Sequence, residues 1–145
     1  MKMNGLVSSS HAVSQLTYHL EWCPKYRRNL FRKEENRQLC EVLIREVANR
    51  HHIEIIELFV MPDHVHAVAR LPISMSPAKA CQLLKGGTSY LLQRVKPNYR
   101  KMYPKRHLWS PGKFARCVGD ADLETTCRYV RNQRDVHQRT LVAYA

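Results

Sequence analysis

Two histidines one residue apart, His64 and His66, follow the pair Pro62-Asp63 inside the apolar stretch Val60 to Val68. The Pro-Asp pair favours a turn, because proline presets φ and aspartate bonds its own backbone two residues on. Side chains alternate across a strand, so the two imidazoles should point to one face, about 7 Å apart at the backbone. Such a pair can converge on a metal ion that accepts imidazole, including Mg or Mn in mixed nitrogen and oxygen sites. Two polar residues on a solvated sheet face would show the same pattern.

A second candidate pair, Tyr129 and Gln133, lies near the C-terminal end of the sequence. The two residues are four positions apart, so on a helix they share a face. A tyrosine hydroxyl is a competent nucleophile once it is activated, and a glutamine oxygen could complete a site begun by two histidines. Alternatively, Tyr129 is a half-buried residue of an ordinary amphipathic helix.

Positive charge is the main compositional signal. Lys and Arg number 24 against 12 acids, which gives a formal net charge of +12. Such an excess indicates a polyanionic partner, although a ribosomal protein would look the same. The basic stretch Lys25-Tyr26-Arg27-Arg28 suits a nucleic-acid backbone with one stacked base, or an ordinary solvated loop. A second basic stretch, Asn98 to His107, includes Arg106 and is predicted to be a linker.

Length and hydropathy restrict the class of protein. With 145 residues, the chain is predicted to form one domain over residues 15–145, after a loose leader over residues 1–14. No apolar run approaches the roughly 20 residues needed to span a bilayer. The five widely spaced cysteines form no C-x-x-C motif, which favours reduced thiols and a cytoplasmic protein without membrane contact.

The elements that would position these residues follow from hydrophobic periodicity. Gly86-Gly87 interrupts the second predicted helix and indicates either a kink or a close approach by another backbone. The element order predicts an α+β fold, a ferredoxin-like or RRM-like antiparallel sheet with helices on one face and an added C-terminal helix. The predicted strands are Thr17–Cys23, Ile53–Val60, His64–Leu71 and Lys113–Val118, and the predicted helices are Lys33–His51, Pro77–Val95 with Ser76 as its N-cap, and Asp122–Gln138.

Together these motifs resemble the single-tyrosine HUH transposases of the IS-two-hundred-like insertion-sequence family. The resemblance extends from Tyr18 to Gln138. Two positions depart from the family pattern, His52 where glycine is common and Lys113 where an aromatic residue is common, and these departures concern target specificity. The matching elements are Tyr18-His19-Leu20-Glu21-Trp22-Cys23-Pro24-Lys25-Tyr26-Arg27-Arg28, Met61-Pro62-Asp63-His64-Val65-His66, Leu84-Lys85-Gly86, Leu108-Trp109-Ser110-Pro111-Gly112 and Tyr129-Val130-x-Asn132-Gln133.

The resemblance implies a metal-dependent enzyme that cleaves and rejoins single-stranded DNA with hairpin ends. By carry-over, His64, His66 and Gln133 would hold Mg²⁺ or Mn²⁺, and Tyr129 would form a 5′-phosphotyrosine while releasing a 3′-OH. A homodimer is implied as well, in which the tyrosine helix can complete the site of the other subunit. The candidate DNA-binding residues are Lys25, Tyr26, Arg27, Arg28, Lys85 and Arg106.

Three alternatives remain open at the level of sequence. A relaxase or replication-type nickase would use the same chemistry, although such proteins are usually larger and carry a different third metal ligand. A host protein derived from a transposase would be indistinguishable by these motifs. A non-catalytic RRM-like binder would use the basic and aromatic residues on single strands and would cut nothing.

Overall fold

Strand β1 (Thr17–Trp22) lies inside a four-stranded antiparallel sheet of order β2-β3-β1-β4. The computed structural model describes residues 16–143, so the predicted leader over residues 1–14 lies outside the described residues. Within the described part of the chain, no helix is both long and apolar enough to cross a membrane. The other elements are η1 (Lys25–Arg27), α2 (Glu34–Arg50), β2 (Glu54–Met61), β3 (His64–Arg70), α3 (Pro77–Val95), α4 (Pro97–Met102), β4 (Phe114–Cys117) and α5 (Asp120–Ala143).

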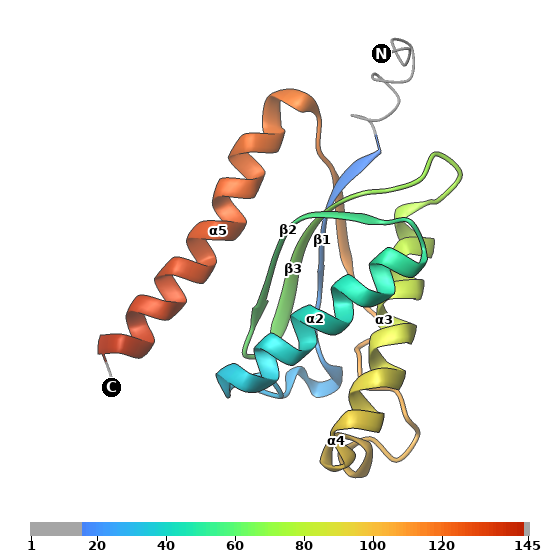
Figure 1. Ribbon diagram of the computed structural model, residues 1–145, viewed down its shortest axis with the longest axis vertical. Coiled ribbons are helices and arrows are strands. Elements are labelled where there is room, and N and C mark those ends of the chain that lie inside the picture. The colour runs from blue at the N-terminus through green and yellow to red at the C-terminus, as the bar shows by residue number, and fades with distance from the viewer. Residues whose placement is uncertain (1–15, 144–145) are drawn as a thin grey trace.

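The main hydrophobic core lies between one face of the sheet and helices α2 and α3 (Figure 1). Strand alternation directs Leu20 and Trp22 of β1 and Val65 of β3 into this core, where all three are buried. Helix α2 contributes Ile44 and Val47 from its apolar stripe. The predicted α+β ferredoxin-like sheet is therefore confirmed.

Helix α5 lies on the opposite face of the sheet from α2 and α3 (Figure 1). A smaller apolar cluster joins Cys127 and Val130 of this helix to Phe59 of β2 and Val68 of β3. The same sheet face carries the residues that alternate with the main core, including both histidines of β3. The added C-terminal helix therefore lies next to the predicted site.

The segment Asn98 to His107 is not the simple linker that the sequence predicts. Its first half forms α4, and its tyrosines, Tyr99 and Tyr103, are buried. The Tyr99 hydroxyl donates to the carbonyl of Leu30, and the Tyr103 hydroxyl donates to the carbonyl of Lys25. The prediction was wrong because the basic residues around the two tyrosines indicated a solvated segment, whereas the tyrosines are buried and bind a loop that is distant in the sequence.

The glycine pair in α3 marks a close approach to helix α2. A Cβ on Gly87 would lie 2.7 Å from Cγ1 of Val47, whereas a Cβ on Gly86 would meet nothing within 4 Å. Helix α3 runs without interruption from Pro77 to Val95. Of the two predicted explanations, the structure therefore supports a close approach by α2 and not a kink. The approaching group is the side chain of Val47.

Candidate metal and tyrosine site

The two predicted histidines converge at the start of β3. The Nε2 atoms of His64 and His66 lie 3.0 Å apart. The Nδ1 atom of His64 lies 2.7 Å from a carboxylate oxygen of Asp63, and Arg27 donates from Nε to the other oxygen of Asp63 at 3.1 Å. A carboxylate that accepts the Nδ1 proton leaves the Nε2 lone pair of His64 free to bind a metal.

The electrostatics of the pair follow from burial and from Arg27. Burial by itself would raise the pKa of Asp63, but the hydrogen bond and charge of His64, together with Arg27, hold that pKa below its ordinary value. His66 is 3% exposed. Burial, and secondarily the charge of His64, lowers its pKa to about 4. His66 is therefore a neutral, buried candidate ligand, and the solvated-face interpretation of this histidine is wrong.

Strand β1 adds two residues that the sequence analysis did not single out as ligands. Glu21 lies opposite His66 in the antiparallel register, and His19 lies opposite Val68. Nε2 of His19 is 3.4 Å from Nδ1 of His66, and an oxygen of Glu21 is 3.6 Å from each of these nitrogens. The sequence signal was the alternation of His19 and Glu21 with the apolar residues of β1, but the strand pairing was needed to place them here.

Tyr129 lies over this histidine cluster in the same chain. Its ring centroid is 6.0 Å from that of His66 and 6.1 Å from that of His19, both in edge-on geometry. The residue remains 48% exposed, so it is accessible from the surface of the protein. Helix α5 is held in place by an ion pair from Arg131 to Glu57 and by a hydrogen bond from Arg134 to the carbonyl of Leu58.

Gln133 is half-buried one helical turn after Tyr129. Among the interactions of residues 16–143, no hydrogen bond, ion pair or ring contact joins Gln133 to His64 or His66. The structure therefore brings together two of the three predicted metal ligands and the predicted nucleophile. The third predicted ligand, Gln133, lies one helical turn after Tyr129 without a direct interaction of these kinds to either histidine.

The residues present fit a divalent cation. The two converging Nε2 atoms lie at the spacing of neighbouring ligands around an octahedral ion with bonds of about 2.1 Å, which is about 3.0 Å. Two lone pairs at this distance repel one another unless a proton or a cation lies between them. His64 and His66 are therefore suited to hold a metal through their Nε2 atoms.

A cavity of about 210 Å³ opens beside the histidine pair. Its lining includes His64, Glu21 and Phe114, with the cations Arg27 and Lys113. Two cations next to the candidate metal ligands provide an environment that attracts a phosphate group.

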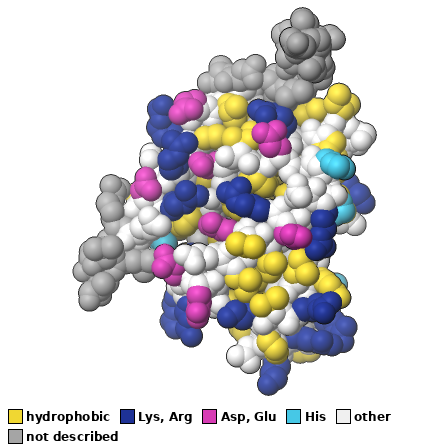
Figure 2. Space-filling model, viewed as in Figure 1, with side chains coloured by type: hydrophobic (Ala, Val, Ile, Leu, Met, Phe, Trp, Pro, Cys, Tyr) yellow, Lys and Arg dark blue, Asp and Glu magenta, His cyan; other side chains and the backbone are white. Residues whose placement is uncertain are grey.

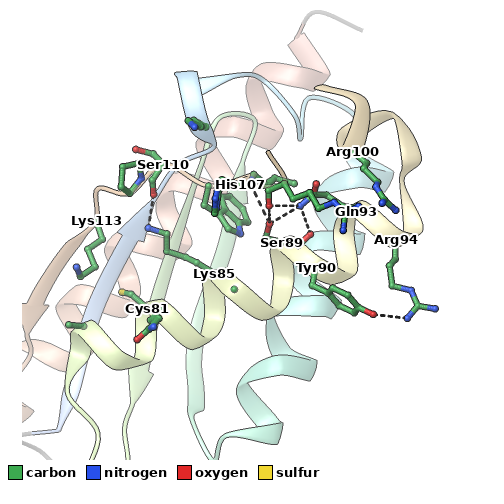
Figure 3. A pocket seen from close by; sticks show the side chains of 18 residues that line it. Cys81, Lys85, Ser89, Tyr90, Gln93, Arg94, Arg100, His107, Ser110 and Lys113 are labelled. Carbon is green, nitrogen blue, oxygen red and sulfur yellow. Dashed lines mark hydrogen bonds between the residues drawn. The ribbon is translucent and has the colours of Figure 1, made fainter. Parts of the chain in front are cut away.

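A larger pocket of about 720 Å³ lies between α3 and the segment that leads to β4 (Figure 3). Lys113 and Ser110 line both cavities, so the two are adjacent. The lining contains no Asp or Glu. Six Lys or Arg residues contribute to it: Lys25, Lys85, Arg94, Arg100, Arg106 and Lys113. Figure 2 shows further Lys and Arg side chains gathered at the lower end of one face, over α4.

The six predicted DNA-binding residues therefore divide into two groups. Lys25, Lys85 and Arg106 line the larger pocket, and Lys85 donates from Nζ to the carbonyls of Ser110 at 2.6 Å and Gly112 at 3.3 Å. Burial lowers the pKa of Lys85. This lysine holds the pocket wall in place, which its position in the sequence did not reveal.

The second group contains Tyr26, Arg27 and Arg28, of which Arg27 binds Asp63 as described above. Tyr26 has a positive φ of 64° and is 71% exposed. Arg28 lies with Cζ 5.3 Å from the Tyr26 ring centroid. An exposed aromatic ring flanked by cations is a suitable surface for an unpaired base.

Comparison with solved structures places the fold among transposases. A protein from Deinococcus radiodurans R1 that is described as a transposase aligns with a TM-score of 0.67 and 25% identity, over 92% of this chain and 97% of that chain. A REP-associated tyrosine transposase, solved bound to a REP hairpin, aligns with a TM-score of 0.61 over 86% of this chain and 70% of that chain. The latter is 16% identical and supports the fold alone.

Sequence comparison then gives the family. The model of the family "Transposase IS200 like" matches residues 12–133, and the chain belongs to this family of DNA-cleaving and strand-transferring enzymes. The ISDra2 transposase TnpA of Deinococcus radiodurans is 32% identical over 127 residues, which cover 85% of this chain and 87% of that protein. The transposase for insertion sequence element IS200 of Salmonella typhimurium is 30% identical over 112 residues, covering 77% of this chain and 73% of that protein.

Proposed function

We propose that this transposase cleaves and rejoins single-stranded DNA through a covalent bond to Tyr129, next to a divalent ion held by His64 and His66. The observation that carries the proposal is the position of Tyr129. Its ring lies 6.0 Å from that of His66, whose Nε2 lies 3.0 Å from Nε2 of His64. A phenol next to two convergent imidazoles can act as a covalent nucleophile on a phosphate, because a metal held by the imidazoles would activate the reaction.

The reaction exchanges one phosphodiester for another. The Tyr129 oxygen gives up its proton and forms a bond to phosphorus, the bond between phosphorus and the 3′ oxygen breaks, and the leaving oxygen takes up a proton to become a free 3′-OH. A bound Mg²⁺ or Mn²⁺ would polarise the phosphoryl oxygen. Because the phosphotyrosine conserves the bond energy, a later attack by a 3′-OH rejoins DNA without a nucleotide cofactor. Gln133, one turn after Tyr129, is the proposed third ligand.

The two adjacent cavities define the proposed path of the DNA strand. Arg27 and Lys113 at the smaller cavity would neutralise the scissile phosphate, and the larger basic pocket would bind the neighbouring part of the DNA. A REP-associated tyrosine transposase of the same fold was solved bound to a REP hairpin, and hairpin DNA is the ligand that we propose here. Tyr26, exposed between cations, is proposed to stack on an unpaired base.

A covalent-adduct assay tests the nucleophile. The protein is incubated with single-stranded end DNA and Mg²⁺, and adducts are separated by denaturing electrophoresis and mapped by mass spectrometry. Tyr129→Phe should form no adduct but should bind DNA normally, because only one exposed oxygen is lost. Tyr90→Phe is the control for loss of an exposed phenol: Tyr90 is 60% exposed on α3 and lines the larger pocket, so this variant should still form the adduct at saturating DNA. An adduct at a tyrosine other than Tyr129 would refute the proposal.

A mixing experiment tests which chain supplies the tyrosine. Tyr129 and His66 of one chain lie together, so we propose that each site is built within one chain. Heterodimers of Tyr129→Phe with His64→Ala should then stay inactive, because each subunit lacks one essential group. Recovery of partial cleavage would mean that α5 serves the partner's site in solution.

The homodimer is proposed to form through β4. The other edge strand, β2, is capped, because Glu41 accepts from the backbone N–H of Val60 and Arg134 donates to the carbonyl of Leu58. Strand β4 is the opposite edge of the sheet, and an edge strand can pair with a second copy. A proline in place of Ala115 should give monomers by sedimentation, whereas an unchanged dimer would exclude this interface.

A further inference from the structure

His19, Glu21 and His66 form a group of potential metal ligands on the sheet face beneath Tyr129. Their ligand atoms all lie within 4.8 Å of one another. The group uses Nδ1 of His66, whereas the pair with His64 uses Nε2 of the same ring. His66 therefore presents one nitrogen to each of two candidate ion positions.

The spacing of the three donor atoms matches a tetrahedral ion. The separations are 3.4 Å between the two nitrogens and 3.6 Å from each nitrogen to the oxygen of Glu21. A tetrahedral Zn²⁺ with bonds of about 2.1 Å separates its ligands by about 3.4 Å. At 3.6 Å the carboxylate is too far from either ring for a good hydrogen bond. Two imidazoles and one carboxylate are also a common set of protein ligands for zinc with an open fourth position.

We infer that His19, Glu21 and Nδ1 of His66 form a Zn²⁺ site that excludes a second ion from the His64–His66 pair. A neutral imidazole has one lone pair and one N–H. When Nδ1 of His66 gives its lone pair to zinc, the ring proton resides on Nε2, and the ring can no longer bind an ion together with His64. Zinc at this site is therefore an inhibitor of the metal-dependent reaction.

Access to the zinc site comes from the smaller cavity. His19 and His66 are buried, but the side chain of Glu21 is 32% exposed and lines the cavity of about 210 Å³. The rings of Phe114 and His19 pack in edge-on geometry, with the centroids 5.7 Å apart. A hydrated ion can thus reach Glu21 first and then lose water to the two imidazoles.

Calorimetric titration of the full-length protein with Zn²⁺ tests the site independently of activity. Wild type should bind one zinc ion. Glu21→Ala and His19→Ala should each lower the zinc affinity by more than 10- to 100-fold, which is the loss typical of removing an outer-shell partner. His64→Ala is the matched control and should keep the zinc affinity, because His64 belongs only to the other ion position. Circular dichroism checks that each variant is folded. Loss of zinc in His64→Ala with retention in Glu21→Ala would overturn the inference.

Cobalt provides a spectroscopic test of the ligand type. Co²⁺ in place of zinc should give the visible absorption of a tetrahedral ion without a thiolate-to-cobalt charge-transfer band. A charge-transfer band would show that cysteines hold the ion, and would refute the site. An octahedral cobalt spectrum would also refute the site, because the spacing of the donor atoms requires four-coordination.

The inhibitory part of the inference rests on the proposed function. Cleavage with Mg²⁺ is measured for each variant with and without one equivalent of Zn²⁺, relative to that variant's own zinc-free rate. Wild type should lose most of its activity, and an active Glu21→Ala should lose little. Equal inhibition of both would refute the competition. If the protein binds zinc through Glu21 but never cleaves DNA, the proposed function is refuted while the zinc site is supported.

Discussion

The glycine pair of α3 gives a prediction with an internal control. Gly86→Ala and Gly87→Ala add the same methyl group to adjacent residues of one helix. The structure distinguishes them, because the new Cβ at Gly87 would lie 2.7 and 2.9 Å from the two Cγ atoms of Val47, while the Cβ at Gly86 has open space. Valine is stiff about χ1, so Val47 cannot easily rotate away.

The expected free-energy changes follow from two opposing contributions. Alanine in place of glycine stabilises a helix interior by about 1 kcal/mol. Overpacking a well-packed contact costs about 1–3 kcal/mol. Gly86→Ala should therefore stabilise the protein by about 1 kcal/mol, and Gly87→Ala should be about 1–3 kcal/mol less stable than Gly86→Ala.

Equilibrium urea unfolding of both variants measures this difference. A double-mutant cycle with Val47→Ala isolates the contact, because the smaller side chain makes room for the new methyl group. In the Val47→Ala background, Gly87→Ala should stabilise the protein to a similar extent as Gly86→Ala. Equal stabilisation by both glycine substitutions in the wild-type background would refute the close approach of α2 and α3.

Three further predictions concern a buried hydrogen bond, a buried phenol and the DNA contacts. Thr88→Val should destabilise the fold by about 1–3 kcal/mol in urea unfolding, because the Trp109 indole N–H loses its buried acceptor at 2.9 Å, whereas Thr88→Ser should cost less. Burial raises the pKa of Tyr99 to about 12, so stability present below pH 10 should fall by about 2–3 kcal/mol as the pH rises to 12, because the unfolded chain loses its proton first. Tyr99→Phe should flatten this decline, and an unchanged pH profile would exclude Tyr99 as its source. The logarithm of DNA affinity should fall linearly with the logarithm of salt concentration, and Lys113→Ala should reduce the slope by about 0.7 if this lysine binds one phosphate of a single strand. A slope unchanged by the substitution would remove Lys113 from the DNA path.

Local periodicity was sufficient to predict most of the elements. Alternation along residues 64–70 placed His64 and His66 on one face, as the structure has them, because the two-residue repeat of a strand is independent of its neighbours. The helical spacing of Tyr129 and Gln133 was likewise a local property. Ser76 before Pro77 predicted the start of α3, where the serine side chain accepts from the N–H of Lys79.

Contacts between distant segments were decided only by the tertiary structure. His19 and Glu21 are 47 and 45 positions away from His66 in the sequence, and only the register of β1 against β3 brings them to its ring. The basic stretch around Tyr99 looked like a solvated linker, because the carbonyl that its hydroxyl binds belongs to a loop near Leu30. Lys85 is a predicted DNA-binding residue, and only the fold reveals that its ammonium also donates to the carbonyl of Ser110, 25 residues away.

The same division applies to the candidate site. The residue types and spacings of the sequence determined which chemistry was available: two imidazoles on one strand face and a phenol on a helix. The packing of α5 through Val130 onto Phe59 decided that this phenol lies over the imidazoles of its own chain. A periodic pattern specifies which face of an element is apolar, but the partner of that face depends on shape complementarity summed over the whole fold.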